Sequence, residues 1–264
     1  MQKIHLEEIK STNTFMLEAL ANGEDYREGT VIYTLRQTAG RGQIGNSWES
    51  EIDKNIAFSI LFRPEFIPIK EQFLISEITC IAIIEVLRAI AERILGKDSD
   101  FAQEKLCIKW PNDIYFRDEK LGGILIENSL QGNTLNYSVV GVGININQEK
   151  WIGNAPNPIS LKKILGQEIS PLVVFDKVTE KIWFYYSLLQ AGMKEKIHEK
   201  YTSLLYRKEG FFPYKETESG EEFLARLVSV EPSGYLHLED NSGKSYRYMF
   251  KEVKFVLPCG VTKE

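Results

Sequence analysis

The sequence has few cysteines and histidines and no long apolar segment. Its three cysteines, Cys80, Cys107 and Cys259, stand far apart and form no C-x-x-C pair. This argues against a disulfide framework or a zinc knuckle and favours a reducing compartment. Charged residues interrupt the most apolar stretch, residues 73–91, so it predicts a core helix rather than a membrane span. Because the N-terminus also lacks the apolar core of a signal peptide, we expect a cytoplasmic protein with no membrane partner.

An excess of positive charge is also missing. The 32 Lys and Arg residues are outnumbered by 37 Asp and Glu, which gives a net charge of -5. This balance argues against broad nucleic-acid binding. The 264 residues, 43% of them hydrophobic, suit one large and one small globular domain.

Several well-known catalytic motifs are absent or wrongly placed. Residues 40–45, G-R-G-Q-I-G, match a dinucleotide fingerprint, but a predicted strand follows where a helix should receive the pyrophosphate. There is no G-x-S-x-G and no H-E-x-x-H, and the three histidines are scattered. The sequence therefore gives little support for a dinucleotide-binding protein, a hydrolase or a zinc enzyme.

The hydrophobic pattern predicts a mixed, largely antiparallel sheet with helices. A helix of about three turns should begin at the N-caps of residues 11–13 and end at Gly23. Longer helices are expected over residues 71–95 and about 171–206, with loops over 96–105 and 150–170. Strand-like segments occupy residues 3–6, 30–37, 55–62, 106–110, 113–116, 122–130 and 135–146.

The C-terminal part of the chain has a different pattern. From residue 207 onward, polar and apolar residues alternate between the glycine-containing turns Ser219-Gly220, Ser233-Gly234 and Ser242-Gly243. This pattern predicts a small all-β domain over residues 207–264, in the form of a short barrel, after a first domain over residues 1–206.

A glycine-rich segment is the first candidate ligand site. Gly40, Gly42 and Gly45 would let a ligand approach the backbone closely, and Arg41 offers a cation suited to carboxylate or phosphate. Such a segment could close over an anionic ligand and exclude water. An ordinary surface loop explains the same residues.

A second candidate is K-W-P-N-D at residues 109–113 with the strand that follows. A bend at Pro111 and a turn at Asp118-Glu119 would bring Lys109, Asn112 and Asp113 close to Lys120. The lysines would offset phosphate charge, while Asp113 could hold magnesium or receive an amine. Taken singly, core packing and a solvated turn lysine explain these residues as well.

A third candidate is G-V-G-I-N at residues 141–145. Glycines inside a strand mark a bulge or a close approach of the backbone, and Asn145 could present its amide to a ligand. Tight internal packing explains these glycines equally well.

Together these segments resemble the biotin protein ligases, also called biotin–[acetyl-CoA-carboxylase] ligases. The set occurs in order and consists of S-T-N at 11–13, R-Q-T-A-G-R-G-Q-x-G-N-x-W at 36–48, K-W-P-N-D at 109–113, K-L-G-G-I-L-I-E at 120–127 and G-V-G-I-N at 141–145. Each motif is weak alone, whereas the ordered set is specific.

The resemblance implies an α+β fold of the class II synthetase and biotinyl/lipoyl ligase type. A mixed, largely antiparallel sheet flanked by helices would form a biotin/ATP-binding catalytic domain, residues 1–206, followed by a small SH3-like barrel. Such ligases join biotin to ATP as biotinyl-5'-AMP and transfer the biotinyl group to a lysine of a biotin carboxyl carrier protein domain. Magnesium would accompany ATP without assigned protein ligands, and the protein would be a monomer or homodimer.

The resemblance also implies roles for individual residues. Lys120 and Arg41 would be catalytic, and Asp113 would orient the acceptor lysine. The expected biotin-binding residues are Ser11, Thr12, Asn13, Gln37, Gly40, Arg41, Gly42, Gln43, Lys120 and Gly123. The expected ATP-binding residues are Arg41, Lys109, Asn112, Lys120 and Asn145. Some relatives carry a second arginine at the position of Gln43, so the phosphate grip here would rest more on the other cations.

Some relatives carry an N-terminal helix-turn-helix, but S-T-N begins here at residue 11, so we expect no DNA-binding role.

Two other functions remain open. A lipoate–protein ligase or octanoyltransferase would share the catalytic fold, although the motifs at 40–48 and 109–113 favour biotin. A non-catalytic biotin or nucleotide sensor would bind ligand without releasing pyrophosphate.

Overall fold

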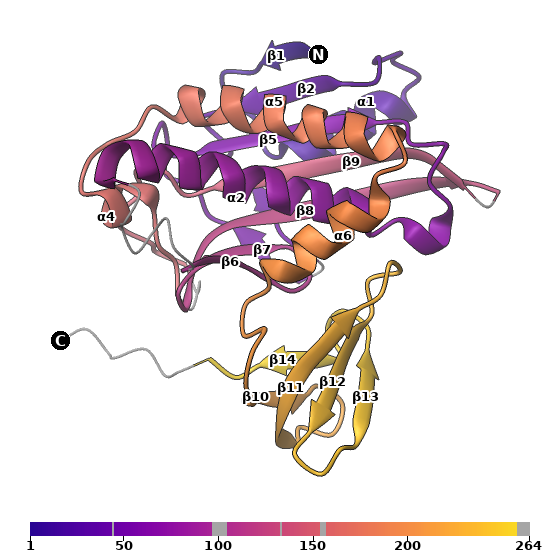
Figure 1. The fold of residues 1–264 in the computed structure, drawn as a ribbon. Helices are drawn as coiled ribbons and strands as arrows, with labels where there is room; N and C mark the ends of the chain where they lie inside the picture. The colour runs from indigo at the N-terminus through magenta and orange to yellow at the C-terminus, as the bar shows by residue number, and fades with distance from the viewer. Residues whose placement is uncertain (44, 97–104, 133, 154–156, 258–264) are drawn as a thin grey trace.

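The central feature is a seven-stranded sheet in the order β1-β2-β5-β9-β8-β7-β6 (Figure 1). The computed structural model describes residues 1–43, 45–96, 105–132, 134–153 and 157–257. The strands are β1 (Gln2–His5), β2 (Thr30–Thr34), β5 (Ile56–Phe62), β6 (Leu106–Lys109), β7 (Asp113–Phe116), β8 (Glu119–Gln131) and β9 (Thr134–Ile144). Because β1 and β2 run parallel and the other neighbours antiparallel, the expected mixed, largely antiparallel sheet is confirmed.

The helices lie unequally on the two sides of this sheet. They are α1 (Thr12–Ala21), the short 3₁₀ turn η1 (Ile69–Glu71), α2 (Leu74–Leu95), α4 (Leu161–Leu165), α5 (Pro171–Gln190) and α6 (Lys194–Ser203). Helices α2 and α5 run side by side across one face (Figure 1). Among the described residues, no helix is both long and apolar enough to cross a bilayer.

Strand periodicity explains the two faces. Successive side chains of a strand point to opposite sides, so Phe58, Ile60 and Phe62 of β5 enter the large core under α2 and α5. Leu61 points the other way and packs with Met16 of α1 in a smaller core. The continuous apolar run of β5 is therefore that of a strand covered on both faces.

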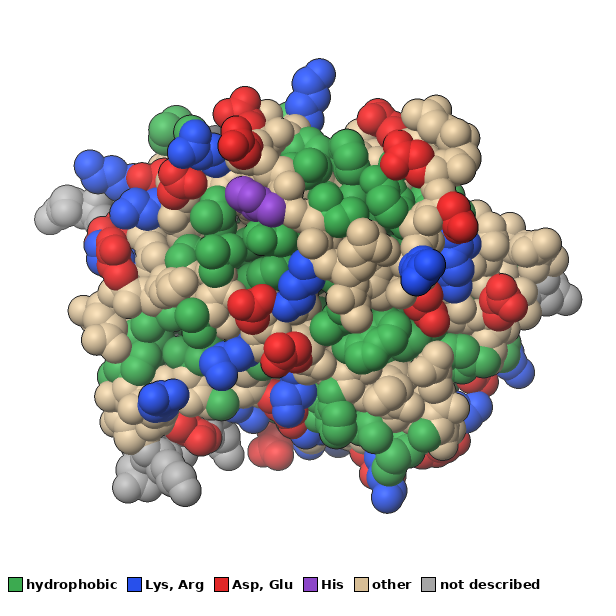
Figure 2. Space-filling model, turned by 90° about the horizontal axis from the view of Figure 1, so that it is seen from above, with side chains coloured by type: hydrophobic (Ala, Val, Ile, Leu, Met, Phe, Trp, Pro, Cys, Tyr) green, Lys and Arg blue, Asp and Glu red, His purple; other side chains and the backbone are tan. Residues whose placement is uncertain are grey.

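Strand β1 forms one edge of the sheet and contacts helix α5. Lys3 of β1 forms an ion pair with Asp176 of α5, with its Nζ 2.7 Å from Oδ1. Viewed from above, basic and acidic side chains lie next to one another between small apolar patches (Figure 2). The strand is short and bears charge, which are features that discourage pairing with another chain at a sheet edge.

The first two predicted helices are confirmed. Ser11 caps α1 by accepting a hydrogen bond from the Thr14 amide, and Gly23 follows the helix with φ +85°. Helix α2 ends at Gly96, as expected. Most of the predicted loop over 96–105 lies outside the described residues.

The single helix expected over residues 171–206 is wrong. Helix α5 ends at Gln190 and α6 begins at Lys194, because Gly192 adopts φ +81°, a left-handed conformation that interrupts a helix. The break turns α6 back over α2. Within the loop expected over 150–170, the short helix α4 forms behind the cap Ser160.

The C-terminal residues form a separate five-stranded antiparallel sheet in the order β13-β12-β11-β10-β14. Its strands are β10 (Phe212–Glu216), β11 (Glu222–Val230), β12 (Leu236–Asp240), β13 (Ser245–Tyr248) and β14 (Val253–Phe255). The predicted turn glycines Gly220, Gly234 and Gly243 all have positive φ. Within the described residues no strand pairing joins β13 to β14, so the sheet is open and barrel closure is not confirmed.

Specific contacts attach this second sheet to the first. The Ile108 amide donates to the Leu204 carbonyl, and the Tyr206 amide donates to the Ile108 carbonyl, so the connecting chain covers the edge of β6. Trp110 Nε1 donates to the carbonyl of Gly234 at 3.0 Å. The segment after β6 is therefore held between the two sheets.

A buried carboxylate and a histidine link α2 to α6. The Glu77 side chain is 0% exposed, and its Oε1 lies 2.8 Å from His198 Nδ1. Burial raises the pKa of Glu77, and the hydrogen bond to Glu77 raises the pKa of His198. The stability that His198 contributes is thus fully present below its unfolded pKa, about 6.5, and is lost as pH rises through its folded pKa.

We predict that His198→Gln destabilises the protein more at acidic than at alkaline pH. Removing the charged hydrogen bond should lower the free energy of unfolding by about 2 kcal/mol at pH 5.5 and by clearly less at pH 9. Urea unfolding at both pH values measures the difference. His237→Gln, which removes one of the partners of the partly exposed Glu231 and leaves Arg247 in place, is the control and should change little. Equal losses at both pH values for His198→Gln would contradict the assignment.

Candidate active site

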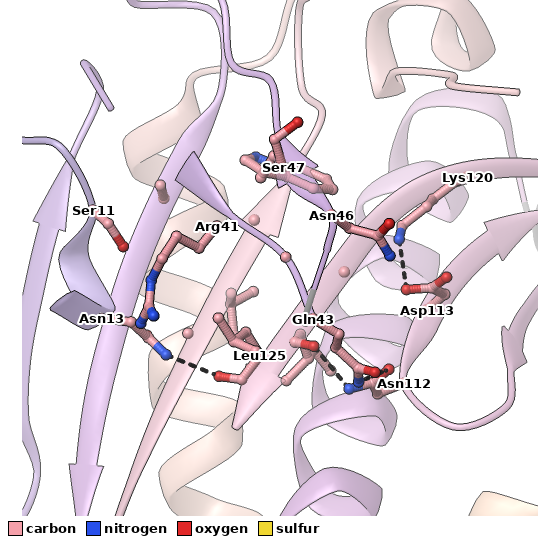
Figure 3. Close-up of a pocket in the computed structure, with 18 of the residues that line it drawn as sticks. Ser11, Asn13, Arg41, Gln43, Asn46, Ser47, Asn112, Asp113, Lys120 and Leu125 are labelled. Atoms are coloured by element: carbon pink, nitrogen blue, oxygen red, sulfur yellow. Dashed lines mark hydrogen bonds and ion pairs between the residues drawn. The ribbon is translucent and has the colours of Figure 1, made fainter. Parts of the chain in front are cut away.

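A polar pocket lies on the sheet face opposite α2 and α5. It is roofed by a hairpin of β3 (Gly40–Arg41) and β4 (Ser47–Trp48), which crosses the strands in Figure 3. The rest of the lining comes from the N-terminus of α1, Gln37, strands β5, β7, β8 and β9, residues 109–112 and Phe250 of the C-terminal part. The pocket holds about 790 Å³ of empty space, its open mouth included, which is enough for a small organic ligand.

The floor of the pocket is a row of small residues across neighbouring strands. Ala57 of β5 pairs with Gly143 of β9, and Gly143 pairs with Gly123 of β8. The row continues to Asp113 of β7. Since paired residues point to the same face, three small side chains in one row leave a hollow in the sheet.

Two strand glycines allow polar and aromatic side chains to rest on this floor. A Cβ on Gly143 would lie 2.5 Å from Trp48 Cε2, and a Cβ on Gly141 would lie 2.2 Å from Asn13 Oδ1. Neither distance is compatible with a side chain. The sequence alone left two explanations for these glycines open, a close approach to the backbone and tight internal packing. Tight packing holds here, and the packed side chains are themselves walls of the pocket.

One end of the pocket, the uncharged end, is formed by the neutral polar side chains of Ser11, Thr12 and Asn13. Ser11, Thr12 and Asn13 are all at most 5% exposed. Ser59 Oγ lies 2.5 Å from Asn13 Oδ1 and 2.8 Å from Thr12 Oγ1. Because an amide oxygen only accepts, Ser59 donates its single proton to Asn13 and accepts from Thr12. The Gln37 side chain accepts from the Thr12 amide at 3.0 Å.

The other end carries cationic side chains. Lys120 Nζ lies 2.7 Å from Asp113 Oδ1 (Figure 3). It also lies 5.9 Å from the centre of a Trp48 ring. Lys109 is mostly buried, and desolvation lowers its pKa although Asp113 opposes the shift. An ammonium group that is already stripped of water interacts strongly with an arriving anion.

The hairpin is attached to the floor at two points. Arg41 Nη2 lies 2.6 Å from Glu127 Oε2 of β8. Gln43 Nε2 donates to Asn112 Oδ1 at 3.2 Å, and Asn112 Nδ2 donates to the Ile124 carbonyl at 2.8 Å. Both attachments reach the face that bears the pocket.

Most of the residues expected from sequence line this one pocket. They are Ser11, Thr12, Asn13, Gln37, Arg41, Gly42, Gln43, Lys109, Asn112, Asp113, Lys120 and Gly123. Arg41 and Lys120, which the resemblance made catalytic, thus share a cavity. The structure does not test the ligand contacts themselves, which remain predictions.

Gly40 and Asn145 lie outside the lining. A Cβ on Gly40 would lie 2.4 Å from the Trp48 carbonyl, so this glycine permits the hairpin pairing. Asn145 Nδ2 donates to the carbonyls of Lys120 and Ile159, and thereby supports the strand that carries Lys120. The nucleotide contact expected of Asn145 is not tested by this arrangement.

Sequence reasoning assigned no role to several residues that build the pocket. Trp48 and Glu127 are the last residues of the motifs at 36–48 and 120–127, so membership in these motifs was a sequence signal for both. Ser59 stands inside an apolar strand, where a buried hydroxyl predicts a hydrogen-bond partner. Phe250 lies far along the chain and carries no sequence signal for this site.

Comparison with known proteins decides the family. A model of the biotin/lipoate A/B protein ligase family matches residues 6–145, more than half of the chain and every residue that lines the pocket except Phe250. The chain belongs to this family. The pocket therefore lies almost entirely within the segment that the family model matches.

Individual members of the family differ in length. The bifunctional ligase/repressor BirA of Bacillus spizizenii is 30% identical over 148 residues, 56% of this chain and 42% of that protein. This chain thus spans less than half of that relative. The biotin–[acetyl-CoA-carboxylase] ligase of Paracoccus denitrificans is 24% identical over 88% of this chain and 89% of its own. A biotin protein ligase structure from Aquifex aeolicus matches 97% of this chain and 99% of its own, with a TM-score of 0.76 at 23% identity, which establishes the fold.

We predict that Gly143→Ala disturbs the hairpin of this family member. The new methyl group cannot coexist with the Trp48 ring, so the free energy of unfolding should fall by about 1–3 kcal/mol and hairpin amides should exchange faster. Gly123→Ala is the matched comparison, because its Cβ would lie 3.3 Å from the flexible end of Lys120. Hydrogen exchange and urea unfolding measure both variants. An equal effect of the two substitutions would refute the packing role of Gly143.

Proposed function

We propose that this chain is an ATP-dependent biotin–[acetyl-CoA-carboxylase] ligase. It activates biotin as biotinyl-5'-AMP with release of pyrophosphate and transfers the biotinyl group to a lysine of a biotin carboxyl carrier protein domain. One observation carries the proposal: a single pocket joins an uncharged polar end to a cationic end, with Arg41 and Lys120 in its lining. The Aquifex aeolicus ligase of the same fold was solved in complex with biotin and ATP.

The uncharged end suits the ureido ring of biotin. That ring offers one carbonyl acceptor and two N–H donors, and the hydroxyl and amide groups of Ser11, Thr12 and Asn13 can donate and accept in turn. The apolar part of the ring system would then lie on the glycine floor near Leu125. Its acid chain would point toward Lys120 at the opposite end.

The cationic end suits the first half-reaction. A carboxylate oxygen of biotin forms a bond to the α-phosphorus of ATP, and the bond from that phosphorus to the bridging oxygen breaks as pyrophosphate leaves. Two anions must approach each other, so Lys120 and the desolvated Lys109 would offset their repulsion. The buried Trp48 Nε1 has no hydrogen-bond partner among the described residues and would add a donor.

Asp113 suits the second half-reaction. The amine of the acceptor lysine attacks the carbonyl carbon of the mixed anhydride, AMP leaves, and the amine must lose a proton. Asp113 lies in the pocket beside Lys120, which supports a role for its carboxylate in orienting the acceptor amine and accepting that proton. Its ion pair with Lys120 would also hold the two groups at the same end of the ligand.

Magnesium would arrive with the nucleotide. The described part of the chain contains no group of three or more His, Cys, Asp or Glu side chains arranged to hold a metal ion. The phosphates of ATP would therefore supply most of its ligands, and the ion would neutralise part of their charge.

The C-terminal sheet would complete the site. We assign residues 1–206 to the catalytic domain and residues 207–264 to a small SH3-like domain, whose Phe250 would close the pocket beside Trp110. We expect a cytoplasmic enzyme, monomeric or homodimeric, whose partners are biotin, ATP and the carrier domain rather than nucleic acid.

Biotin-dependent exchange of labelled pyrophosphate into ATP tests the proposal directly. Exchange is expected with biotin and not with lipoate, and the purified protein should then label a carrier domain with biotin. Exchange with lipoate alone would identify a lipoate ligase. Tight biotin binding without any exchange would identify a non-catalytic sensor.

We predict that Lys120→Met lowers pyrophosphate exchange by at least about 100-fold, because it removes a cation from the reacting groups. The thermal midpoint should change little, since Lys120 is partly exposed. Lys215→Met, in an exposed pair with Glu222 of the C-terminal sheet, is the control and should keep full activity. Undiminished exchange by Lys120→Met would remove this lysine from the mechanism.

We also predict that ligands protect the hairpin segment. Trypsin should cut within residues 39–53 of the free protein, where Arg41 is partly exposed, and should cut much more slowly with biotin and ATP present. Mass spectrometry of the fragments locates the cuts. The same cutting rate in both states would show that this segment does not close over the ligands.

A further inference from the structure

One carboxylate outside the pocket lining contacts two of its walls. Glu127 lies on β8 two residues beyond Leu125, and strand alternation places both on the face that bears the pocket. Its Oε2 atom accepts from Arg41 Nη2 at 2.6 Å and from Asn13 Nδ2 at 2.9 Å. The hairpin and α1 therefore meet at a single oxygen atom of the sheet.

This contact determines the orientation of the Asn13 amide. Nδ2 of Asn13 donates to the Leu125 carbonyl at 3.2 Å as well as to Glu127, and both partners only accept. A flipped amide would place its oxygen against these two acceptors, which is unfavourable. Oδ1 must therefore face the buried hydroxyl of Ser59.

The same contact positions the Arg41 arm of the hairpin. In Figure 3 the Arg41 side chain extends toward Asn13, away from Lys120 and Asp113. The ionic bond to Glu127 holds it there, while the hydrogen bond from Gln43 to Asn112 attaches the turn that follows Arg41. Without Glu127 the described part of the Arg41 arm would keep only its short strand pairing and its backbone contacts.

We propose that Glu127 is a positioning residue that assembles the uncharged end of the pocket before any ligand binds. It acts through Asn13 and Arg41 and does not touch the ligand itself. The proposal deepens the function proposed above and rests on it for the identity of the ligand, which is the ureido ring of biotin. Because Glu127 acts at that end, its loss should weaken biotin binding and leave the cationic end intact.

The test compares Glu127→Gln with wild type in the pyrophosphate exchange assay. The substitution keeps the size of the side chain but removes its charge. We expect the KM for biotin to rise about tenfold, while kcat and the KM for ATP change less than about twofold. Hydrogen exchange of the free protein should be faster at residues 40–43 and 45–48.

Glu239→Gln is the matched control. Glu239 also pairs with an arginine, Arg226, at 2.7 Å and with similar exposure, but it lies on the C-terminal sheet. All kinetic constants and hairpin exchange rates should stay at the wild-type level. The double variant Arg41→Gln/Glu127→Gln should show hairpin exchange no faster than the faster single variant, because either change breaks the same bond.

The contrary results are distinct. An unchanged KM for biotin with unchanged hairpin exchange would overturn the proposal. So would a general loss, in which the thermal midpoint, kcat and both KM values change together and the double variant is additive. If wild type shows no biotin-dependent exchange, the proposed function fails instead, and the hairpin exchange rates alone then decide whether Glu127 positions this end of the pocket.

Discussion

The row of small residues across the central sheet is the constraint on which the pocket depends. Ala57, Gly143 and Gly123 stand opposite one another on neighbouring strands, and their lack of bulk allows a second layer of side chains to approach the backbone. Trp48 lies over Gly143 of this row, Asn13 lies over Gly141 of the next row, and both become pocket walls. A larger residue in this row would fill the space that the walls and the ligand need.

Charge in the pocket is balanced locally before any ligand arrives. Arg41 pairs with Glu127 and Lys120 pairs with Asp113, so two of the cations are held in place by carboxylates. Lys109 differs, because its ammonium group lies over the rings of Tyr115 and Phe255 and is largely desolvated. Fixed cations in a partly dry site need little reorganisation when phosphate or carboxylate enters.

Local patterns predicted most individual elements well. Strands β5 to β9, the cap at Ser11 and the end of α2 at Gly96 follow from periodicity, capping and glycine chemistry, all of which act over a few residues. The break at Gly192 was missed, because helical periodicity on both sides of it hides a single left-handed residue. Barrel closure in the C-terminal sheet depends on pairing between distant strands, which local patterns do not report.

The sequence by itself determined which side chains could take part in the chemistry. The ordered motifs contained all the basic side chains of the pocket and all of its glycines, because residue type and short spacing are properties of the chain. Only the tertiary structure decided that these segments share one cavity, that Asn145 supports the Lys120 strand rather than lining the pocket, and that Phe250 joins it. The physical reason is that strand register and the packing of distant elements, not local propensity, determine which residues face each other.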